Sequence, residues 1–176
     1  RSGFTKQGCF EIHTDNIEGA LELYDYFFKI GKEFNLKPGT PNHPERIEGG
    51  LLSYGSDMDI FDNPFECGFD KYVDLNSNIV FLGKENLIKI KEKGINKKLL
   101  GVKIDSKFID VEQGLPMLDL KDNEVGQLRS AAYSPKFNKV VGIAMIKKGF
   151  WEISQKFKIN INGKFVSGEI CNLPIV

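Results

Sequence analysis

The first residues of the chain alternate between apolar and polar side chains, as in a half-buried strand. In residues 9–14, Phe10 and Ile12 fall on one face, whereas Glu11 and His13 fall on the other. Because side chains in a strand point alternately to its two faces, this pattern predicts a strand with one buried side. It also predicts that Glu11 and His13 point in the same direction.

Helical spacing replaces this alternation after Asp15-Asn16, a pair typical of helix N-termini. Up to about Asn35 the apolar residues at this spacing are Ile17, Ala20, Leu21, Tyr24, Phe27, Phe28 and Ile30. They predict an amphipathic helix. The proline-rich segment 37–44 predicts a loop, and residues 45–54 predict a short helix that ends near Gly55.

The pattern changes near residue 96 from mixed elements to strands alone. Residues 71–75 predict a strand and residues 83–93 a helix. The later apolar residues form short alternating runs, which are residues 100–104, 115–120, 124–133, 140–146, 157–161 and 165–171. The last two runs are joined by Asn162-Gly163, a dipeptide preferred in tight hairpin turns. We therefore expect an α+β chain with two parts, residues 1–95 and an all-β, barrel-like domain of residues 96–176.

The composition is that of a globular chain with no electrostatic preference for a polyanion. Hydrophobic residues make up 41% of the 176 residues, and 24 Lys and Arg balance 24 Asp and Glu. This balance disfavours nucleic acid or a membrane surface as partner. Because no apolar run reaches the ~20 residues of a membrane helix and residues 1–8 do not resemble a signal peptide, we expect a soluble, cytoplasmic protein. Without an initiator Met, and with a strand-like segment so close to Arg1, the sequence is expected to be a fragment of a longer chain.

Cysteine and histidine are too sparse for a disulfide framework or a metal centre. Cys9, Cys67 and Cys171 are odd in number and far apart, which favours reduced, buried thiols. His13 and His43 are the only histidines, so a His-rich metal site is not expected. The cysteine count likewise argues against a disulfide.

An acidic cluster, formed by Asp57, Asp59, Asp62 and Glu66, could suggest calcium. An EF-hand loop counted from Asp57 needs an oxygen ligand at its fifth position and Gly at its sixth, but these positions hold Phe61 and Asp62. We therefore expect a solvated turn.

Three other side chains have both a structural and a functional interpretation. On pattern alone, Glu11 is an ordinary exposed glutamate of a strand. Arg46 is one of few arginines in a lysine-rich chain, and its planar fork is expected to form an ion pair, for instance with Glu48 or Glu66. Tyr54 is by default an aromatic of the core or its rim.

Several segments of the sequence are similar to the motifs of one enzyme family. We align RSGFTKQGCFEIH with the motif R-T-G-Y-T-G-E-D-G-F-E-I, and ERIEGGLLSYGSDMD with R-L-E-A-G-x-x-L-Y-G-x-D-x-D. The segments DNPFECGFDKYVDL and FLGKENL resemble T-P-x-E-A-G-L and F-I-G-K-E-A-L, and the similarity continues into LRSAAYSP, VVGIAMI and NLPIV. These motifs belong to the glycine-cleavage T-protein (aminomethyltransferase) family, so the chain resembles that family over essentially its whole length.

The resemblance implies both a fold and a set of folate-binding residues. It implies a folate-binding α+β region with a ferredoxin-like portion, followed by a carboxy-terminal antiparallel β-barrel. The family's pterin-binding glutamate falls on Glu11, where a carboxylate can accept hydrogen bonds from a ring N–H and the neighbouring amino group. The family's aromatic seven positions earlier falls on Phe4, placed to pack on the ligand. His13 and Tyr54 complete the expected binding residues for tetrahydrofolate.

The sequence also departs from the family pattern. The arginine that T-proteins carry four residues before their R-L-E falls on Asn42. The family's catalytic aspartate lies in the amino-terminal half, so no catalytic residue is expected in this chain, and the chain alone is expected to be inactive. FLGKE has no cysteine, which argues against the family branch linked to iron-sulfur cluster assembly and its K-G-C-Y-x-G-Q-E motif.

Among the branches of the family, FECGFDKYV looks most like dimethylsulfoniopropionate demethylase, which moves a methyl group from a sulfonium to tetrahydrofolate. The resemblance therefore implies a tetrahydrofolate-dependent methyltransferase. Its expected partners are a small-molecule methyl donor and the amino-terminal half of the same protein. Two alternatives stay open. One is an aminomethyltransferase of the glycine-cleavage type, which needs a lipoyl-carrying protein, and the other is a folate-binding module without catalysis.

Overall fold

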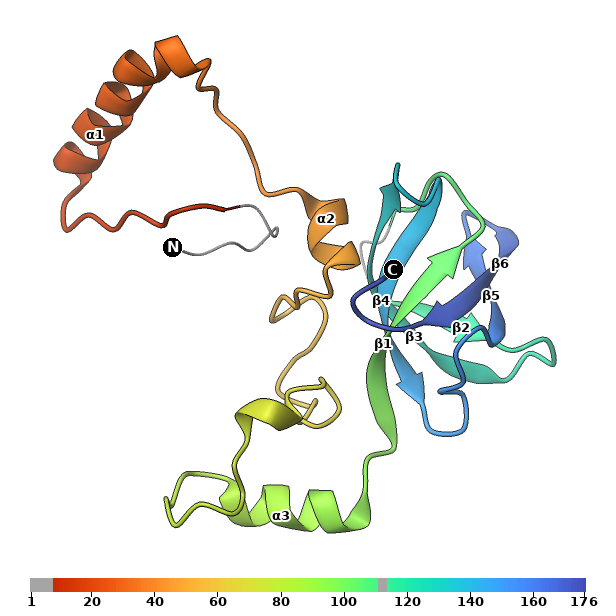
Figure 1. Ribbon diagram of the computed structural model, residues 1–176. Coiled ribbons are helices and arrows are strands. Elements are labelled where there is room, and N and C mark those ends of the chain that lie inside the picture. The colour runs from red at the N-terminus through yellow and green to blue at the C-terminus, as the bar shows by residue number, and fades with distance from the viewer. Residues whose placement is uncertain (1–7, 111–113) are drawn as a thin grey trace. The chain divides into compact units, whose positions relative to one another are not determined.

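The computed structural model describes residues 8–110 and 114–176 (Figure 1). The chain divides into two compact units, Arg1–Asn42 and His43–Val176. The boundary between family domains expected near residue 96 stays a prediction. Among the described residues, no helix is both long and apolar enough to cross a membrane.

The first unit contains the predicted amphipathic helix. It is α1 (Ile17–Ile30), and the 3-10 turn η1 (Gly31–Phe34) follows it directly. The helix begins where the sequence indicates, because the side-chain oxygen of Asn16 accepts a hydrogen bond from the backbone N–H of Gly19 at 2.6 Å. No residue of α1 is buried. The apolar residues of α1 are therefore either exposed or only half-buried in the described structure.

The strand predicted at residues 9–14 is not formed. These residues have no regular structure apart from a single bridge residue at Cys9, and Phe10 and Ile12 are 77% and 58% exposed. A strand persists only when neighbouring strands satisfy its backbone and cover one face. The described residues of the first unit, 8–42, contain no strand. The prediction was wrong because alternation reports a side-chain pattern and not the presence of a partner strand.

In the second unit, α2 (His43–Glu48) is shorter than the predicted helix. Gly50 has a φ of 63°, and its N–H donates to the carbonyl of Ile47 at 3.0 Å. The N–H of Leu51 donates to the carbonyl of Arg46 at 2.9 Å. This pair of bonds around a left-handed glycine is the Schellman motif. It ends the helix at Glu48, six residues before the predicted end at Tyr54.

The segment between α2 and the barrel contains one wrong and one confirmed prediction. Residues 71–75 do not form a strand, since the 3-10 turn η2 (Asp70–Tyr72) occupies their start. The side chain of Asp74 then accepts hydrogen bonds from the N–H groups of Asn76 and Ser77 at 2.9 and 3.2 Å, which closes a turn. The predicted helix at 83–93 is confirmed as α3 (Lys84–Lys93).

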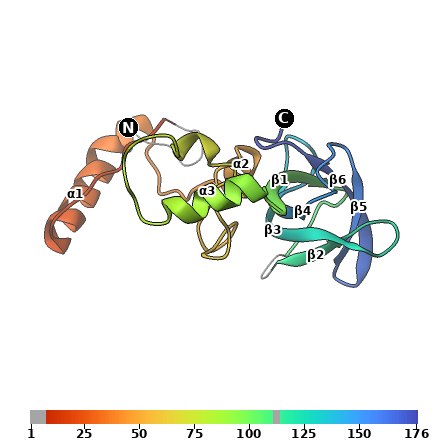
Figure 2. The ribbon, with the colours of Figure 1, turned by 90° about the horizontal axis from the view of Figure 1, so that it is seen from below.

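Six antiparallel strands close into a barrel, which confirms the predicted all-β region. They are β1 (Lys97–Ile104), β2 (Leu115–Leu118), β3 (Glu124–Ser134), β4 (Lys139–Lys147), β5 (Lys156–Ile161) and β6 (Lys164–Cys171). Their order around the barrel is β1-β4-β3-β2-β5-β6, and Figure 2 shows them wrapped around a common interior. Asn162 and Gly163 have φ of 50° and 83°, so the β5–β6 hairpin has the two left-handed residues that a type I′ turn requires.

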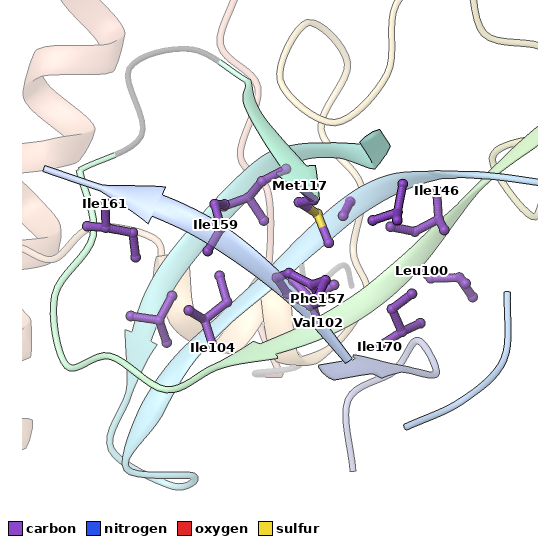
Figure 3. Packing of buried hydrophobic residues seen from close by; sticks show 13 residues of the cluster. Leu100, Val102, Ile104, Met117, Ile146, Phe157, Ile159, Ile161 and Ile170 are labelled. Atoms are coloured by element: carbon purple, nitrogen blue, oxygen red, sulfur yellow. The ribbon is translucent and has the colours of Figure 1, made fainter. Parts of the chain in front are cut away.

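Two apolar clusters lie on opposite sides of the barrel wall. The interior cluster includes Val102, Ile104, Met117, Phe157, Ile159 and Ile170, whose side chains point toward one another in Figure 3. The second cluster includes Ile47 of α2 and, from the barrel strands, Leu99, Val141, Ile143 and Met145. Strand β4 is thus buried on both faces, and α2 is packed against the outside of the barrel. This second cluster fixes α2 and the loop after it, which carry the polar residues described next.

Candidate functional site

Arg46 of α2 lies at the centre of a buried polar network. Its side chain is 3% exposed, and its Nη1 donates to Oδ2 of Asp57 at 2.6 Å and to the carbonyl oxygen of Leu51 at 3.1 Å. Its Nη2 donates to Oγ of Ser130, on β3, at 3.0 Å. The predicted ion pair therefore exists, but its partner is Asp57 and not Glu48 or Glu66.

Asp57 fixes the turn that follows Leu52. It is fully buried, and Oδ2 also accepts the backbone N–H of Ser53 at 2.7 Å. The N–H of Asp57 donates to the carbonyl of Ser53 at 2.9 Å, and the N–H of Gly55 donates to that of Met58 at 2.8 Å. These bonds define the turn of residues 53–58. Tyr54 lies on it and is 67% exposed, so a hydrogen-bonded turn presents an accessible aromatic ring.

The acidic cluster is not the solvated turn that the sequence suggested. The side chains of Asp57 and Asp62 are 0% exposed, and Glu66 is 8% exposed. Asp62 accepts a hydrogen bond from Nζ of Lys97, on β1, and another from the N–H of Asp59 at 3.0 Å. The prediction failed because side chains distant in sequence, Arg46 and Lys97, supply the compensating charges that allow these carboxylates to be buried.

The surroundings of Asp62 shift its protonation equilibrium. Burial by itself raises the pKa of the Asp62 carboxyl, but the hydrogen bonds from Lys97 and the Asp59 N–H, together with the charges of Lys97 and Arg129, lower that pKa overall. The ionised form is therefore the one that the fold stabilises.

The thiols of Cys67 and Cys171 form no disulfide, and their surroundings hold them in the protonated form. Burial, and then the carboxylates of Asp62 and Glu66, raise the pKa of Cys67 to about 11. Burial also raises the pKa of Cys171 to about 11. Because the thiolate is the nucleophilic form, neither thiol is suited to nucleophilic chemistry near neutral pH.

The structure brings together two of the residues that the resemblance assigned to folate. Nε2 of His13 and Oε2 of Glu11 lie 4.0 Å apart, and their side chains are 88% and 69% exposed. They point the same way, as expected, although their segment is not a strand. Tyr54 belongs to the other compact unit, and Phe4 lies outside the described residues. The assignment of all four residues to one folate site stays a prediction.

Sequence reasoning did not identify the structural role of Asp57 or the position of Arg129. Asp57 anchors the turn of residues 53–58, and Arg129 lies with Nη2 at 3.9 Å from Oδ2 of Asp62. The scarcity of arginine was a usable signal for both sites. Arg46 and Arg129 are the only described arginines, and each lies within 4.0 Å of a buried carboxylate, although only Arg46 hydrogen-bonds to its carboxylate.

Comparisons with known proteins agree with these features. The GCVT N-terminal domain matches residues 1–77, and the glycine cleavage T-protein C-terminal barrel domain matches residues 97–176. A dimethylsulfoniopropionate demethylase from Ruegeria pomeroyi is 36% identical over 151 residues, which cover 86% of this chain and 41% of that protein. An aminomethyltransferase from Listeria welshimeri is 35% identical over 178 residues, which cover 99% of this chain and 47% of that protein.

A solved structure shares the fold. The glycine cleavage system aminomethyltransferase T from Bartonella henselae superposes with a TM-score of 0.69 at 20% identity, over 76% of this chain and 37% of that one. This likeness confirms the predicted α+β class with a carboxy-terminal barrel. The chain spans less than half the length of the two curated relatives and of this structure.

Proposed function

The chain belongs to the glycine-cleavage T-protein family, and we propose that the protein containing it is a tetrahydrofolate-dependent one-carbon transferase. More specifically, we propose that it demethylates dimethylsulfoniopropionate, yielding methylthiopropionate and methyl-tetrahydrofolate. The identity of 36% to a relative named for that demethylation supports this donor. A cytoplasmic location, tested by cell fractionation, is part of the same proposal.

The proposed reaction needs little chemical activation. A nitrogen lone pair of tetrahydrofolate attacks the methyl carbon, the carbon–sulfur bond breaks, and its electron pair stays on sulfur, which becomes a neutral thioether. The nitrogen then loses its proton to a base or to water. Because a sulfonium is already a good leaving group, the protein mainly has to align the two reactants and exclude water.

The observation that carries the proposal is the presentation of Tyr54. Its ring is 67% exposed, yet its turn is fixed by the buried pair of Arg46 and Asp57. An aromatic side chain held in this way can pack on a flat heterocycle such as a pterin. Binding then requires less ordering of the protein, a cost of about 0.5–1.5 kcal/mol for a mobile side chain.

Glu11 supplies the polar half of the proposed folate contact. Its carboxylate is exposed and lies 4.0 Å from Nε2 of His13. In the proposed complex, its two oxygens accept hydrogen bonds from the ring N–H and the amino group of the pterin. Tyr54 would add ring packing, and Phe4 a second aromatic contact.

Aminomethyl transfer of the glycine-cleavage type is the second candidate. It is supported by the aminomethyltransferases from Listeria welshimeri and Thermoanaerobacter pseudethanolicus, which are 35% and 31% identical to this chain. Asn42, in place of the arginine typical of T-proteins, favours the demethylase instead. A folate-binding module without catalysis is the third candidate function.

The deciding experiment uses the whole protein that contains this chain. Formation of methyl-tetrahydrofolate is measured with dimethylsulfoniopropionate and with dimethylglycine, and methylene-tetrahydrofolate is measured with the glycine-cleavage components. We expect product from the sulfonium alone. Product only with the glycine-cleavage components would replace the demethylase by the second candidate, and folate binding without turnover on any donor would support the non-catalytic module.

A further inference from the structure

We propose that Arg129 is the anchor of a binding site for a small oxyanion, a phosphate or a carboxylate group, on the outer face of the barrel. The proposal rests on a β-bulge, on the hydrogen-bond donors of Arg129 and on the pocket beside it. It does not depend on the proposed folate chemistry.

A β-bulge in β3 places Arg129 on the outside of the barrel wall. Leu128 pairs with Ala144 and Ser130 pairs with Ile143, so Arg129 is an extra residue in the register of β3 against β4. Leu128 packs in the barrel interior, whereas Ser130 bonds to Arg46 on the outer face. The extra residue therefore allows Arg129 and Ser130 to lie consecutively on that face. Bulges of this kind commonly redirect a side chain near functional sites.

The guanidinium of Arg129 has one donor, Nε, that its described surroundings do not use. Its Nε is buried and has no hydrogen-bond partner among the described residues. Its Nη2 lies 3.9 Å from Oδ2 of Asp62, which is too far for a hydrogen bond. Leaving a buried donor unpaired is unfavourable, so the arrangement favours an additional acceptor. The adjacent N–H groups on Nε and Nη form a fork that matches two oxygens of a carboxylate or phosphate.

A small pocket of about 160 Å³ is lined in part by Arg129. Its lining also includes Lys97, Lys147, Gln127 and the acidic Glu124. The backbone at Gly126 belongs to the wall too, and a Cβ there would lie 2.4 Å from the carbonyl oxygen of Met145, so only glycine permits this close strand approach. A volume of this size holds a phosphate or a carboxylate group but is smaller than the ~300 Å³ or more of a pocket for a drug-sized ligand.

Nearby carboxylates limit the strength of the site. Glu124 pairs with Lys147 at 2.9 Å, Asp62 accepts the hydrogen bond from Lys97, and Glu66 lies 3.9 Å from Nζ of Lys97. The lysines are thus largely neutralised, and the directed donors of Arg129 have to provide the affinity. We therefore expect a dissociation constant on the order of 1 mM, with little contribution from long-range attraction.

The test is a titration of the protein with inorganic phosphate and, separately, with acetate, at constant pH and ionic strength. Binding is followed by isothermal calorimetry and by NMR shifts of labelled arginine side chains. We expect saturable binding of one of the two anions, which also identifies whether the site prefers phosphate or carboxylate. Absence of saturation by both anions at concentrations far above the millimolar range would overturn the proposal.

Variants locate the binding to this pocket. We expect Arg129→Gln to weaken it at least tenfold, and Arg129→Lys to weaken it nearly as much because a lysine lacks the fork. Lys147→Gln, at a half-exposed position, is expected to weaken it about threefold and serves if the Arg129 variants do not fold. The matched control is Lys164→Gln, an exposed lysine of β6, which should leave binding unchanged. Equal binding by the protein and by Arg129→Gln, or by Lys147→Gln if only that variant folds, would show that the anion binds elsewhere and refute the assignment.

Discussion

Replacing Asp57 with Asn tests the buried pair that supports the turn of residues 53–58. The substitution keeps the shape of the side chain and removes its charge. Arg46 would then be a buried cation without its carboxylate, although it retains the carbonyl of Leu51 at 3.1 Å and Oγ of Ser130 at 3.0 Å. Solvent screening is small here, because the side chains of Arg46 and Asp57 are 3% and 0% exposed.

The expected loss follows from the behaviour of buried ion pairs. Removing one partner of such a pair costs about 3–5 kcal/mol. Oδ2 of Asp57 accepts hydrogen bonds from Nη1 of Arg46 and from the N–H of Ser53, and an Asn carbonyl oxygen can still accept one of them. We therefore expect a loss at the lower end of this range, about 3 kcal/mol. For a chain of this length that corresponds to a melting temperature lower by about 6–12 °C.

The assay is differential scanning calorimetry of the Asp57→Asn variant beside the matched control Asp70→Asn. Asp70 is exposed, so its variant should change stability by no more than about 0.5 kcal/mol. Folate affinity, measured well below the melting temperature, should also fall in Asp57→Asn because the turn under Tyr54 is loosened. In Tyr54→Ala the affinity should fall with little change in melting temperature. Equal melting temperatures for the Asp57→Asn and Asp70→Asn variants would refute the anchoring role of the pair.

Three further predictions concern Glu11, Asp62 and Cys67. Glu11→Gln replaces one acceptor oxygen by a donor, so we expect folate affinity to fall roughly ten- to hundredfold, about 1.5–3 kcal/mol, at an unchanged melting temperature; unchanged affinity in a calorimetric titration would remove Glu11 from the site. The folded-state pKa of Asp62 lies below its ordinary value of 3.8, so its ionised form stabilises the fold above that pH and this stabilisation is lost as the pH falls through the folded-state pKa. Urea unfolding should therefore show Asp62→Asn as destabilised at neutral pH, with the difference disappearing in acid, and a difference that persists in acid would contradict this linkage. Since the pKa of Cys67 is raised from 9.0 to about 11, iodoacetamide at pH 8 should label it roughly a hundredfold more slowly in the native than in the unfolded protein, and mass spectrometry that finds equal rates would disprove its shielding.

The strands of the barrel could be predicted from the sequence because each of them carries its own local pattern. Alternating residues mark the inner face, and Asn162-Gly163 marks the turn between β5 and β6. The same reasoning failed at residues 9–14 and 71–75, where the alternation is present but no strand forms. Pairing is a property of two segments, so a pattern within one segment does not establish it.

The polar network around Arg46 also depends on contacts between segments, which a local sequence pattern does not establish. Sequence analysis indicated that Arg46 needs a carboxylate, and the family motifs selected Glu11 and Tyr54 as candidates for folate. It could not indicate that Asp57 is the partner, since the choice depends on the Schellman motif that ends α2 and turns the chain back toward it.

Only the tertiary structure decided which charges are buried. Arg46 reaches Ser130 across 84 positions of sequence, and Lys97 reaches Asp62 across 35. The electrostatic cost of burying a carboxylate depends on the atoms that surround it in space, and those atoms come from elements that lie far apart in the chain. The sequence by itself therefore determined the barrel strands and the family motifs, whereas packing on the outer face of the barrel determined that an apparently solvated acidic turn is a buried, paired network.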